Sequence, residues 1–301
     1  MMTPSFYVAR PVLALPTWWR PDNAWNEDAR MNETNELVRR SEPRPGVVQL
    51  TLARPDKLNA LTAPLVAALR DHLRAIAADL TCRVVVLTGA GRGFCAGLDL
   101  SGFGAIPGTE EFGPTHTTWT VQRTIAALVQ ELRRLPQPVI AAVNGPAAGG
   151  GLALVCASDI RIASTTAVFA TSFIRIGVTG CDIGTSWLLP RLVGAARAHD
   201  LMLTSRRFDA EEALRIGLVT EVAEPDQLSA RVSATVDALL AAPPLSLSLT
   251  KQGMWLALEI PSFDAMVEVE NRQQVLTAAT ADAREAMASY VDRRAADYQY
   301  K

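Results

Sequence analysis

Residues Pro138–Ala157 have the sequence P-V-I-A-A-V-N-G-P-A-A-G-G-G-L-A-L-V-C-A, which is the most informative part of the chain. Its apolar run Val139–Val143 predicts a short buried strand, and the turn-forming sequence N-G-P ends that strand. Three glycines at 149–151 then open an Ala/Leu/Val run that predicts a buried helix. Glycines in a first helical turn leave backbone N–H groups unobstructed at the positive end of the helix dipole. The stretch therefore predicts a place that can hold a negatively charged oxygen.

A second glycine-rich turn follows the buried strand that we predict at Arg83–Thr88. It has the sequence G-A-G-R-G-F-C-A-G-L-D-L, residues Gly89–Leu100. The order G-x-G-x-x-G is missing, so this turn does not indicate a dinucleotide site. Backbone N–H groups from two separate turns can converge on one oxygen, as they do in an oxyanion hole. From the residues alone, an oxyanion hole and simple strand-to-helix connections both remain open.

The rest of the sequence alternates between predicted strands and helices up to Val222 and is helical from Pro225 onward, which predicts an α/β protein. The predicted strands are 47–52, 83–88, 139–143, 159–163, 167–171 and 218–222, and the predicted helices are 62–80, 119–135, 187–203, 209–216, 226–241, 245–258, 263–277 and 280–298. We expect a core over residues 46–242 and a C-terminal helical subdomain over 243–301. Residues 1–45 are rich in proline and show no clear period, so we expect a mobile extension, with Met31 as an alternative start.

The overall composition excludes several classes of function. A net charge of −2 and a pI near 6.0 argue against general binding to nucleic acids or anionic membranes. Lysine occurs only at Lys57, Lys251 and Lys301, so contacts to phosphate groups would rely mainly on arginine or backbone N–H groups. The four cysteines lack C-x-x-C spacing, and no apolar run reaches the ~18 residues of a membrane span. We therefore expect a cytoplasmic protein with reduced thiols and no bound metal.

Five segments together resemble the crotonase, or enoyl-CoA hydratase/isomerase, family. They are F-C-A-G-L-D-L (94–100), V-N-G-P-A-A-G-G-G (143–151), R-P-D-K-L-N-A-L (54–61), S-D-I-R-I-A (158–163) and W-L-L-P-R-L-V-G (187–194). The resemblance implies a spiral of ββα units with a C-terminal helical trimerisation subdomain. It also implies an acyl-coenzyme A substrate, no cofactor beyond the coenzyme A of that substrate, and a homotrimer or a hexamer.

The resemblance also assigns residues to the site. It implies that the backbone N–H groups of Leu98 and Gly150 form the oxyanion hole, and that the coenzyme A lies near Lys57, Ala60, Ala96 and Leu98. An enolate formed from a thioester carries its negative charge on oxygen. Backbone donors at a helix N-terminus stabilise such an oxygen without a titratable group.

The family resemblance also shows which groups are missing. Hydratases of the family use two glutamates, and this sequence has Ala153 and Phe173 at the corresponding places. Neither side chain can transfer a proton, so we do not expect water addition by two carboxylates in the usual way. Both replacements therefore favour an isomerase over a hydratase.

Asp182 is the remaining candidate acid. It lies eight residues before Pro190, a spacing that resembles the aspartate of the dienoyl-CoA isomerase branch. A carboxylate close to Phe173 and Ala153 would be desolvated, which raises its pKa toward neutrality. The structural alternative is that Asp182 caps the helix beginning near Thr185 or pairs with an arginine.

Three other acids compete with Asp182 less well. We interpret Asp99 as a structural or capping group, expect Asp159 to pair with Arg161, and regard Glu131 as a weak candidate for the pocket. The sequence thus favours an acyl-CoA enzyme that stabilises an enolate and shifts a proton or double bond. The alternatives are an enoyl-CoA hydratase with a displaced acid and a non-catalytic acyl-CoA-binding subunit. A serine hydrolase of the Clp type, which shares the spiral fold, would need a serine–histidine pair that the sequence does not suggest.

Overall fold

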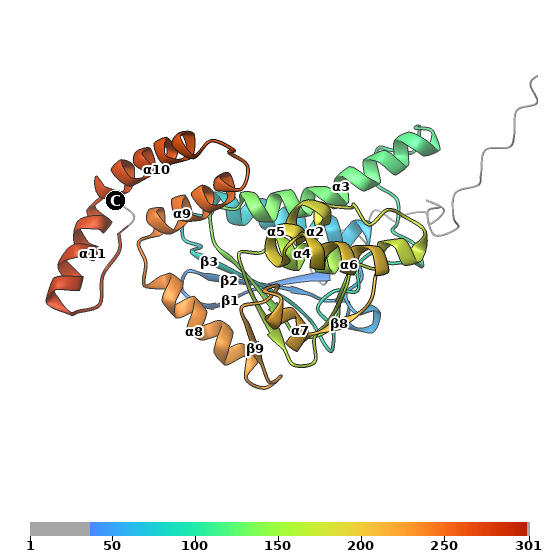
Figure 1. The fold of residues 1–301 in the computed structure, drawn as a ribbon, viewed down its shortest axis with the longest axis horizontal. Helices are drawn as coiled ribbons and strands as arrows, with labels where there is room; N and C mark the ends of the chain where they lie inside the picture. Colours follow the sequence, from blue (N-terminus) through green and yellow to red (C-terminus); the bar gives the residue numbers. More distant parts are fainter. Residues whose placement is uncertain (1–36, 300–301) are drawn as a thin grey trace, which may run out of the picture.

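The computed structural model describes residues 37–299 and is built around a six-stranded sheet (Figure 1). The strand order is β1-β2-β3-β4-β6-β9, and every neighbouring pair except β1–β2 runs parallel. The strands are β1 (Val38–Arg44), β2 (Val47–Leu52), β3 (Val84–Gly89), β4 (Val139–Val143), β6 (Ile160–Ser164) and β9 (Glu221–Ala223). Because a parallel sheet is covered on both faces, its strands are continuous apolar runs, which is why the sequence predicts them well.

Strand β1 corrects the expectation that ordered structure begins at Gly46. It pairs antiparallel with β2, with Val38 opposite Leu52, and the register shifts between Ser41 and Arg44. Apart from Val38, its residues are exposed or half-buried, so this edge strand has no apolar pattern that the sequence could show. The first 36 residues of the predicted mobile extension lie outside the described residues.

Helices cover both faces of this sheet, and β3 shows the division. Val84 and Val86 point to the face that α8 (Leu228–Leu240) covers, whereas Val85 and Leu87 point into the larger core. Helices α2 (Ala63–Ala78), α3 (Pro114–Arg134), α4 (Gly150–Ala157), α5 (Thr185–Val193) and α6 (Ala195–Thr204) contribute to that larger core (Figure 1). The N-terminus of α4 is thus held inside the core and not at the surface.

A small second sheet extends the fold beside α4. It has the order β5-β7-β8, from Ala147–Ala148, Val168–Ala170 and Phe208–Asp209, and it leads into α7 (Ala210–Arg215). The Asp209 side chain caps α7, because it accepts a hydrogen bond from the Glu212 N–H at 2.8 Å. The strand predicted at 218–222 is wrong at its start, since Leu218 donates its N–H to the Ala213 carbonyl and accepts from Arg161 instead of joining the sheet.

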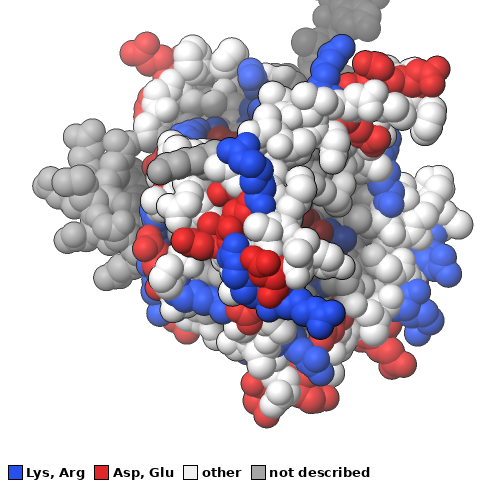
Figure 2. Space-filling model, turned by 90° about the vertical axis from the view of Figure 1, so that its left-hand side faces the viewer, with Lys and Arg blue, Asp and Glu red and all other residues white. Residues whose placement is uncertain are grey.

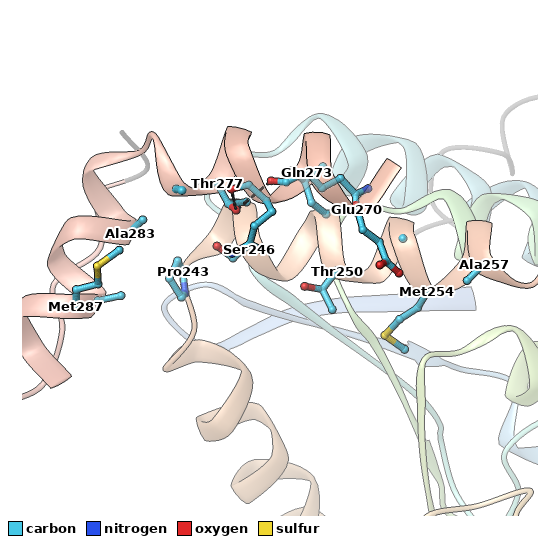
Figure 3. A pocket seen from close by; sticks show the side chains of 15 residues that line it. Pro243, Ser246, Thr250, Met254, Ala257, Glu270, Gln273, Thr277, Ala283 and Met287 are labelled. Carbon is cyan, nitrogen blue, oxygen red and sulfur yellow. Dashed lines mark hydrogen bonds between the residues drawn. The ribbon is translucent and has the colours of Figure 1, made fainter. Parts of the chain in front are cut away.

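Three helices follow α8 after a bend of 106°: α9 (Pro244–Ala257), α10 (Phe263–Ala278) and α11 (Ala281–Asp292). In Figure 1, α10 and α11 extend away from the sheet. A groove of ≈ 660 Å³ lies between them and α9, with Met254, Glu270 and Met287 among its lining residues (Figure 3). Within residues 37–299, no single helix is long and apolar enough to cross a membrane, and only the bent pair α8–α9, taken together, has that length and composition.

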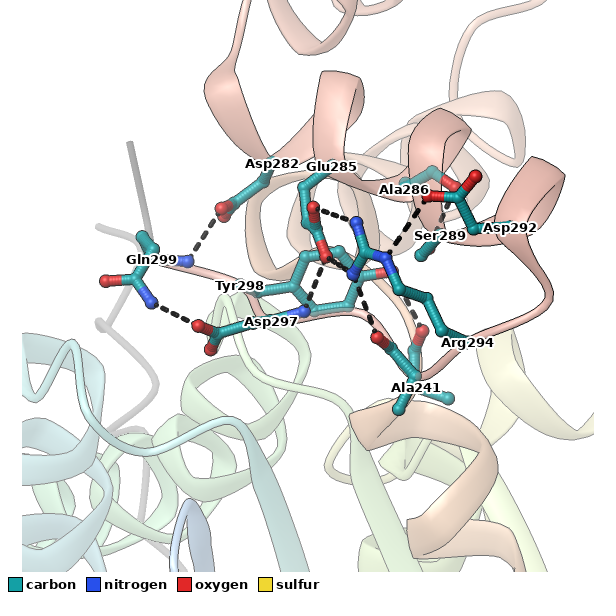
Figure 4. Close-up of polar contacts among 11 residues, drawn as sticks. Ala241, Asp282, Glu285, Ala286, Ser289, Asp292, Arg294, Asp297, Tyr298 and Gln299 are labelled. Carbon is teal, nitrogen blue, oxygen red and sulfur yellow. Dashed lines mark hydrogen bonds and ion pairs between the residues drawn. The ribbon is translucent and has the colours of Figure 1, made fainter.

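The chain after α11 folds back along that helix (Figure 4). Arg294 pairs with both carboxylate oxygens of Glu285, at 2.5 and 2.8 Å, and the Tyr298 hydroxyl donates to the Ala241 carbonyl at 3.1 Å. The helix predicted over 280–298 therefore ends at Asp292, where the left-handed residue Arg293 (φ 53°) terminates it. Figure 2 looks onto this end of the molecule and shows acidic and basic side chains interspersed.

Candidate active site

A cavity of ≈ 300 Å³ brings the predicted oxyanion residues and the predicted acid together. Leu98, Gly150 and Asp182 all line it, although up to 84 positions separate them in the sequence. Helix α3 forms one wall, and the segment from Phe173 to Ile183 forms another. The remaining lining residues that the structure describes are Leu61, Gln122, Ile125, Ile176, Val178, Thr179 and Cys181.

The turn that carries Leu98 is paired on one side only. Leu61 donates its N–H to the Gly97 carbonyl at 2.7 Å and accepts from the Asp99 N–H at 3.0 Å, in a parallel bridge with Leu98. In such a bridge, the N–H of the middle residue points to the opposite side. Gly97 has φ 89°, and a Cβ there would lie 2.7 Å from the Ala148 carbonyl oxygen and 3.2 Å from the Gly150 nitrogen. Only glycine therefore lets the two turns approach each other this closely.

The start of α4 supplies the second donor. Gly149 (φ 50°) precedes the helix, its N–H donates to the Ala170 carbonyl at 3.0 Å, and Gly150 is the first helical residue. A Cβ at Gly151 would lie 2.0 Å from the Cys95 carbonyl oxygen, so the helix packs directly on the other turn. Within the described part of the chain, the N–H groups of Leu98 and Gly150 have no protein acceptor. Both amides are thus available to an oxygen in the cavity.

Asp182 lies in the loop before α5 and is in contact with amide groups. Its Oδ1 accepts hydrogen bonds from Gln122 Nε2 and, at 2.8 Å, from the Ile183 N–H. Burial raises the pKa of the Asp182 carboxyl, and the two hydrogen bonds offset this only in part. Among residues 37–299, no arginine or lysine pairs with it, and the α5 N-cap is Gly184. Neither structural alternative for Asp182, the helix cap or the arginine pair, is found.

The residues expected to contact coenzyme A adjoin the Leu98 turn. Lys57 is exposed at the end of a short 3-10 helix, and the Lys57 carbonyl accepts from the Ala60 N–H at 3.0 Å. Ala96 is half-buried, and its N–H donates to the Leu58 carbonyl at 2.9 Å. The structure therefore places Lys57, the buried Ala60 and Ala96 close together beside Leu98, and their contact with coenzyme A stays a prediction.

The residues at the two predicted glutamate positions are apolar and buried. Ala153 is fully buried within α4, and Phe173 is 7% exposed and lines the cavity. Asp182 and Cys181 are the only ionisable side chains among the described lining residues. Any proton transfer by a carboxylate in this cavity therefore falls to Asp182.

The competing acids are engaged elsewhere. Burial opposes the ionisation of Asp99, but hydrogen bonds from the Ser101 hydroxyl at 2.5 Å, from Arg54 at 2.9 Å and from the Ser101 N–H at 3.0 Å outweigh it and lower the Asp99 pKa. Glu131 pairs with Arg70 at 2.9 Å, outside the cavity lining. The interpretation of Asp99 as a structural group therefore agrees with its contacts.

The prediction that Asp159 pairs with Arg161 is wrong. Asp159 forms its ion pair with Lys251 of α9 at 2.7 Å, while Arg161 donates to the backbone carbonyls of Leu218 and Ser158, each at 2.6 Å. Sequence reasoning also missed Gln122. The only signal was its position three residues before the buried Ile125, on the same face of α3.

Comparison with known proteins agrees with this geometry. The family model for enoyl-CoA hydratase/isomerase matches residues 42–301. The protein named probable enoyl-CoA hydratase EchA12 of Mycobacterium tuberculosis is 40% identical over 269 residues, which cover 89% of this chain and 94% of that protein. The 1,2-epoxyphenylacetyl-CoA isomerase of Escherichia coli is 37% identical over 262 residues, 87% of this chain and 98% of that protein.

A solved structure shows the same fold. The crystal structure of a probable enoyl-CoA hydratase/isomerase from Mycobacterium abscessus superposes with a TM-score of 0.83 at 35% identity, covering 88% of this chain and 99% of that chain. The chain therefore belongs to the enoyl-CoA hydratase/isomerase family.

Proposed function

We propose that this member of the family is an acyl-CoA isomerase that moves a double bond through an enolate, with Asp182 as base and acid. The observation that carries the proposal is that Asp182 is the only carboxylate among the described residues lining the cavity that Leu98 and Gly150 share. The relatives include one named as a hydratase and one named as an isomerase, so family membership allows either reaction.

The proposed reaction needs no water. Asp182 takes a proton from the acyl chain, and the electrons of the broken C–H bond move to the thioester oxygen, which becomes an enolate. The N–H groups of Leu98 and Gly150 stabilise this oxygen; removal of one such donor typically costs about 2.7–4 kcal/mol of transition-state stabilisation. The protonated Asp182 then returns the proton to a different carbon of the chain, and the double bond shifts. Protons and electrons balance without any further reactant.

The lining of the cavity supports an apolar acyl group. Most of its side chains are aliphatic or aromatic, including Phe173, Ile125 and Ile183. The apolar surroundings raise the pKa of Asp182, which suits a group that must both accept and release a proton near neutral pH. An enoyl-CoA hydratase with a displaced acid is the second candidate, because the Mycobacterium tuberculosis relative has the name of a hydratase.

The test compares wild type with Asp182→Asn on two substrates. Isomerisation of 3-hexenoyl-CoA creates the conjugated thioester chromophore, whereas hydration of crotonyl-CoA removes it. We expect wild type to isomerise and Asp182→Asn to lose kcat by about 10²-fold or more, while acyl-CoA binding persists. Asp226→Asn, an exposed aspartate, is the matched control and should retain full activity.

Three other outcomes of these assays would contradict the proposed isomerase. Unchanged turnover in Asp182→Asn would overturn the role of that residue. Hydration of crotonyl-CoA without isomerisation would favour the hydratase. Tight acyl-CoA binding without turnover, across a panel of chain lengths, would favour a non-catalytic binding subunit.

We also propose a homotrimer or hexamer, assembled through the C-terminal helices, in the cytoplasm. In support, α10 and α11 expose large apolar side chains, among them Val275 (71% exposed), Leu276 (60%) and Val291 (77%). Light scattering coupled to size-exclusion chromatography should report three or six copies of the 32.4 kDa chain. Replacement of Leu276 by Asp should shift the mass toward one copy, and a monomeric wild type would contradict the proposal.

A further inference from the structure

The two oxygens of the Asp182 carboxylate differ in the hydrogen bonds that they accept from the protein. Oδ1 accepts from Gln122 Nε2 on α3 and from the Ile183 N–H at 2.8 Å. Oδ2 has no protein donor among residues 37–299. One oxygen is thus held in place, and the other is available for a proton.

The loop around Asp182 is fixed locally by its backbone. The Asp182 carbonyl accepts from the Thr185 N–H at 2.8 Å, and Ile183 has φ 37°. A positive φ is unusual for a β-branched residue, and such conformations gather at functional sites. These contacts set the position of the loop, and the Ile183 N–H holds Oδ1 of the carboxylate from the loop side. The hydrogen bond from Gln122 on α3 holds the same oxygen from across the cavity and further restricts rotation of the carboxylate.

We propose that Gln122 is a positioning residue that holds Oδ1 of Asp182 and so directs Oδ2 toward the acyl chain. The proposal rests on the proposed role of Asp182 in proton transfer. When Oδ2 takes the proton, Oδ1 becomes the carbonyl oxygen of the acid and still accepts from Gln122. The hydrogen bond therefore persists through the whole proton transfer and determines which oxygen carries the proton.

Gln122 also affects the charge of the carboxylate. A hydrogen bond is stronger to an ionised oxygen than to a neutral one, so Gln122 lowers the pKa of Asp182, which burial raises. Cys181 is the only other ionisable side chain among the described lining residues, and Ile125, the other α3 residue in the lining, is neutral. The ionisable residues of α3 on either side of Gln122 are engaged elsewhere, with His116 and Arg123 exposed and Glu131 paired with Arg70. No nearby cation would replace the effect of Gln122.

The test is the pair Gln122→Leu and Gln130→Leu, the same change at a cavity-lining position and at an exposed position of α3. We expect Gln122→Leu to lower kcat for 3-hexenoyl-CoA about tenfold with little change in KM, because binding does not depend on the rotation of Asp182. Loss of the donor disfavours the ionised base, so the acidic limb of the kcat/KM profile should move up by about one pH unit. Gln130→Leu should leave both kcat and the profile unchanged.

Gln122→Asn keeps the amide but shortens its reach, and it guards against misfolding of the leucine variant. It should show the same shift of the acidic limb with normal acyl-CoA binding. A wild-type kcat and profile in both Gln122 variants would overturn the positioning role. Asp182→Asn separates the two failures: a large loss of isomerisation in that variant with wild-type Gln122 variants overturns only the positioning role, whereas unchanged turnover in Asp182→Asn overturns the proposed function.

Discussion

Two partly buried carboxylates, Asp159 and Asp182, are held in opposite ways. Asp159 lies 2.7 Å from Lys251 Nζ and accepts from Trp255 Nε1 at 2.9 Å and from the Val139 N–H at 2.8 Å. Asp182 has only amide donors, from Gln122 and Ile183, and no cation pairs with it among the described residues. Burial raises the pKa of Asp182, because nothing of opposite charge compensates it.

The difference separates Asp159, a structural carboxylate, from Asp182, the carboxylate that we propose transfers a proton. Lys251 also donates to the Gln137 carbonyl at 2.9 Å and to the Leu132 carbonyl at 3.3 Å, so the pair attaches α9 to the core. Burial lowers the pKa of Lys251, and the charge of Asp159 opposes that effect. Both oxygens of Asp159 are occupied, Oδ1 by Trp255 and Oδ2 by Lys251 and the Val139 N–H. Asp182 keeps Oδ2 without a protein donor among residues 37–299.

The largest effect on stability is expected from Lys251→Met, which removes the cation that pairs with Asp159. It leaves Asp159 buried at 12% side-chain exposure without its cation, so we expect the free energy of unfolding to fall by about 3–5 kcal/mol. Urea denaturation measures the loss. Lys57→Met, at an exposed lysine, is the matched control and should change stability by less than about 0.5 kcal/mol. Equal stability of the two variants would show that the buried pair does not hold α9.

A smaller loss of stability is expected at Arg133, which contacts the ring of Trp255, the residue that donates a hydrogen bond to Asp159. The Arg133 guanidinium lies between the rings of Trp187 and Trp255, at 4.6 and 4.5 Å from their centroids, and pairs with Glu259 at 2.6 Å. Arg133→Ala removes both cation–π contacts and should lower stability by about 1–2 kcal/mol. Arg134→Ala, the next residue, is exposed and serves as the control. A melting temperature equal to that of the control would contradict this.

Asp182→Asn should give the opposite sign of stability change. A carboxyl whose pKa is raised by folding destabilises the native state once it ionises. Stability is therefore full below the unfolded pKa and falls as pH rises toward the folded pKa. At pH 7 the asparagine variant should be more stable than wild type by about 1 kcal/mol, a typical gain when an active-site group is replaced. The gain should vanish near pH 3, and a loss at pH 7 would place Asp182 with Asp159 as a structural group.

The smallest effect concerns binding away from both carboxylates. If Lys57 contacts the phosphates of coenzyme A, Lys57→Ala should raise KM for acyl-CoA about threefold at low salt, with kcat unchanged. The change should fade at high ionic strength, because Lys57 is exposed and its charge is screened. An effect on kcat, or none at low salt, would remove Lys57 from the coenzyme A site.

Local patterns allowed much of the fold and part of the site to be predicted. Val47–Leu52 and Val139–Val143 form strands with the predicted bounds, because buried strands are uninterrupted apolar runs. The glycine turns around Leu98 and Gly150 were predicted as neighbours from the family resemblance, because composition alone left simple strand-to-helix connections open, and the structure shows the two turns in contact. Edge strand β1 was missed, since an exposed strand carries no apolar period.

By itself, the sequence determined that two glycine turns lie beside buried strands and that Ala153 and Phe173 cannot transfer protons. Only the tertiary structure decided which charges meet. Asp159 was assigned to Arg161, two residues away, but its cation is Lys251, 92 positions along the chain. Gln122 reaches Asp182 across 60 positions in the same way. The physical reason is that backbone patterns are local, whereas the partner of a buried polar group depends on how distant elements pack.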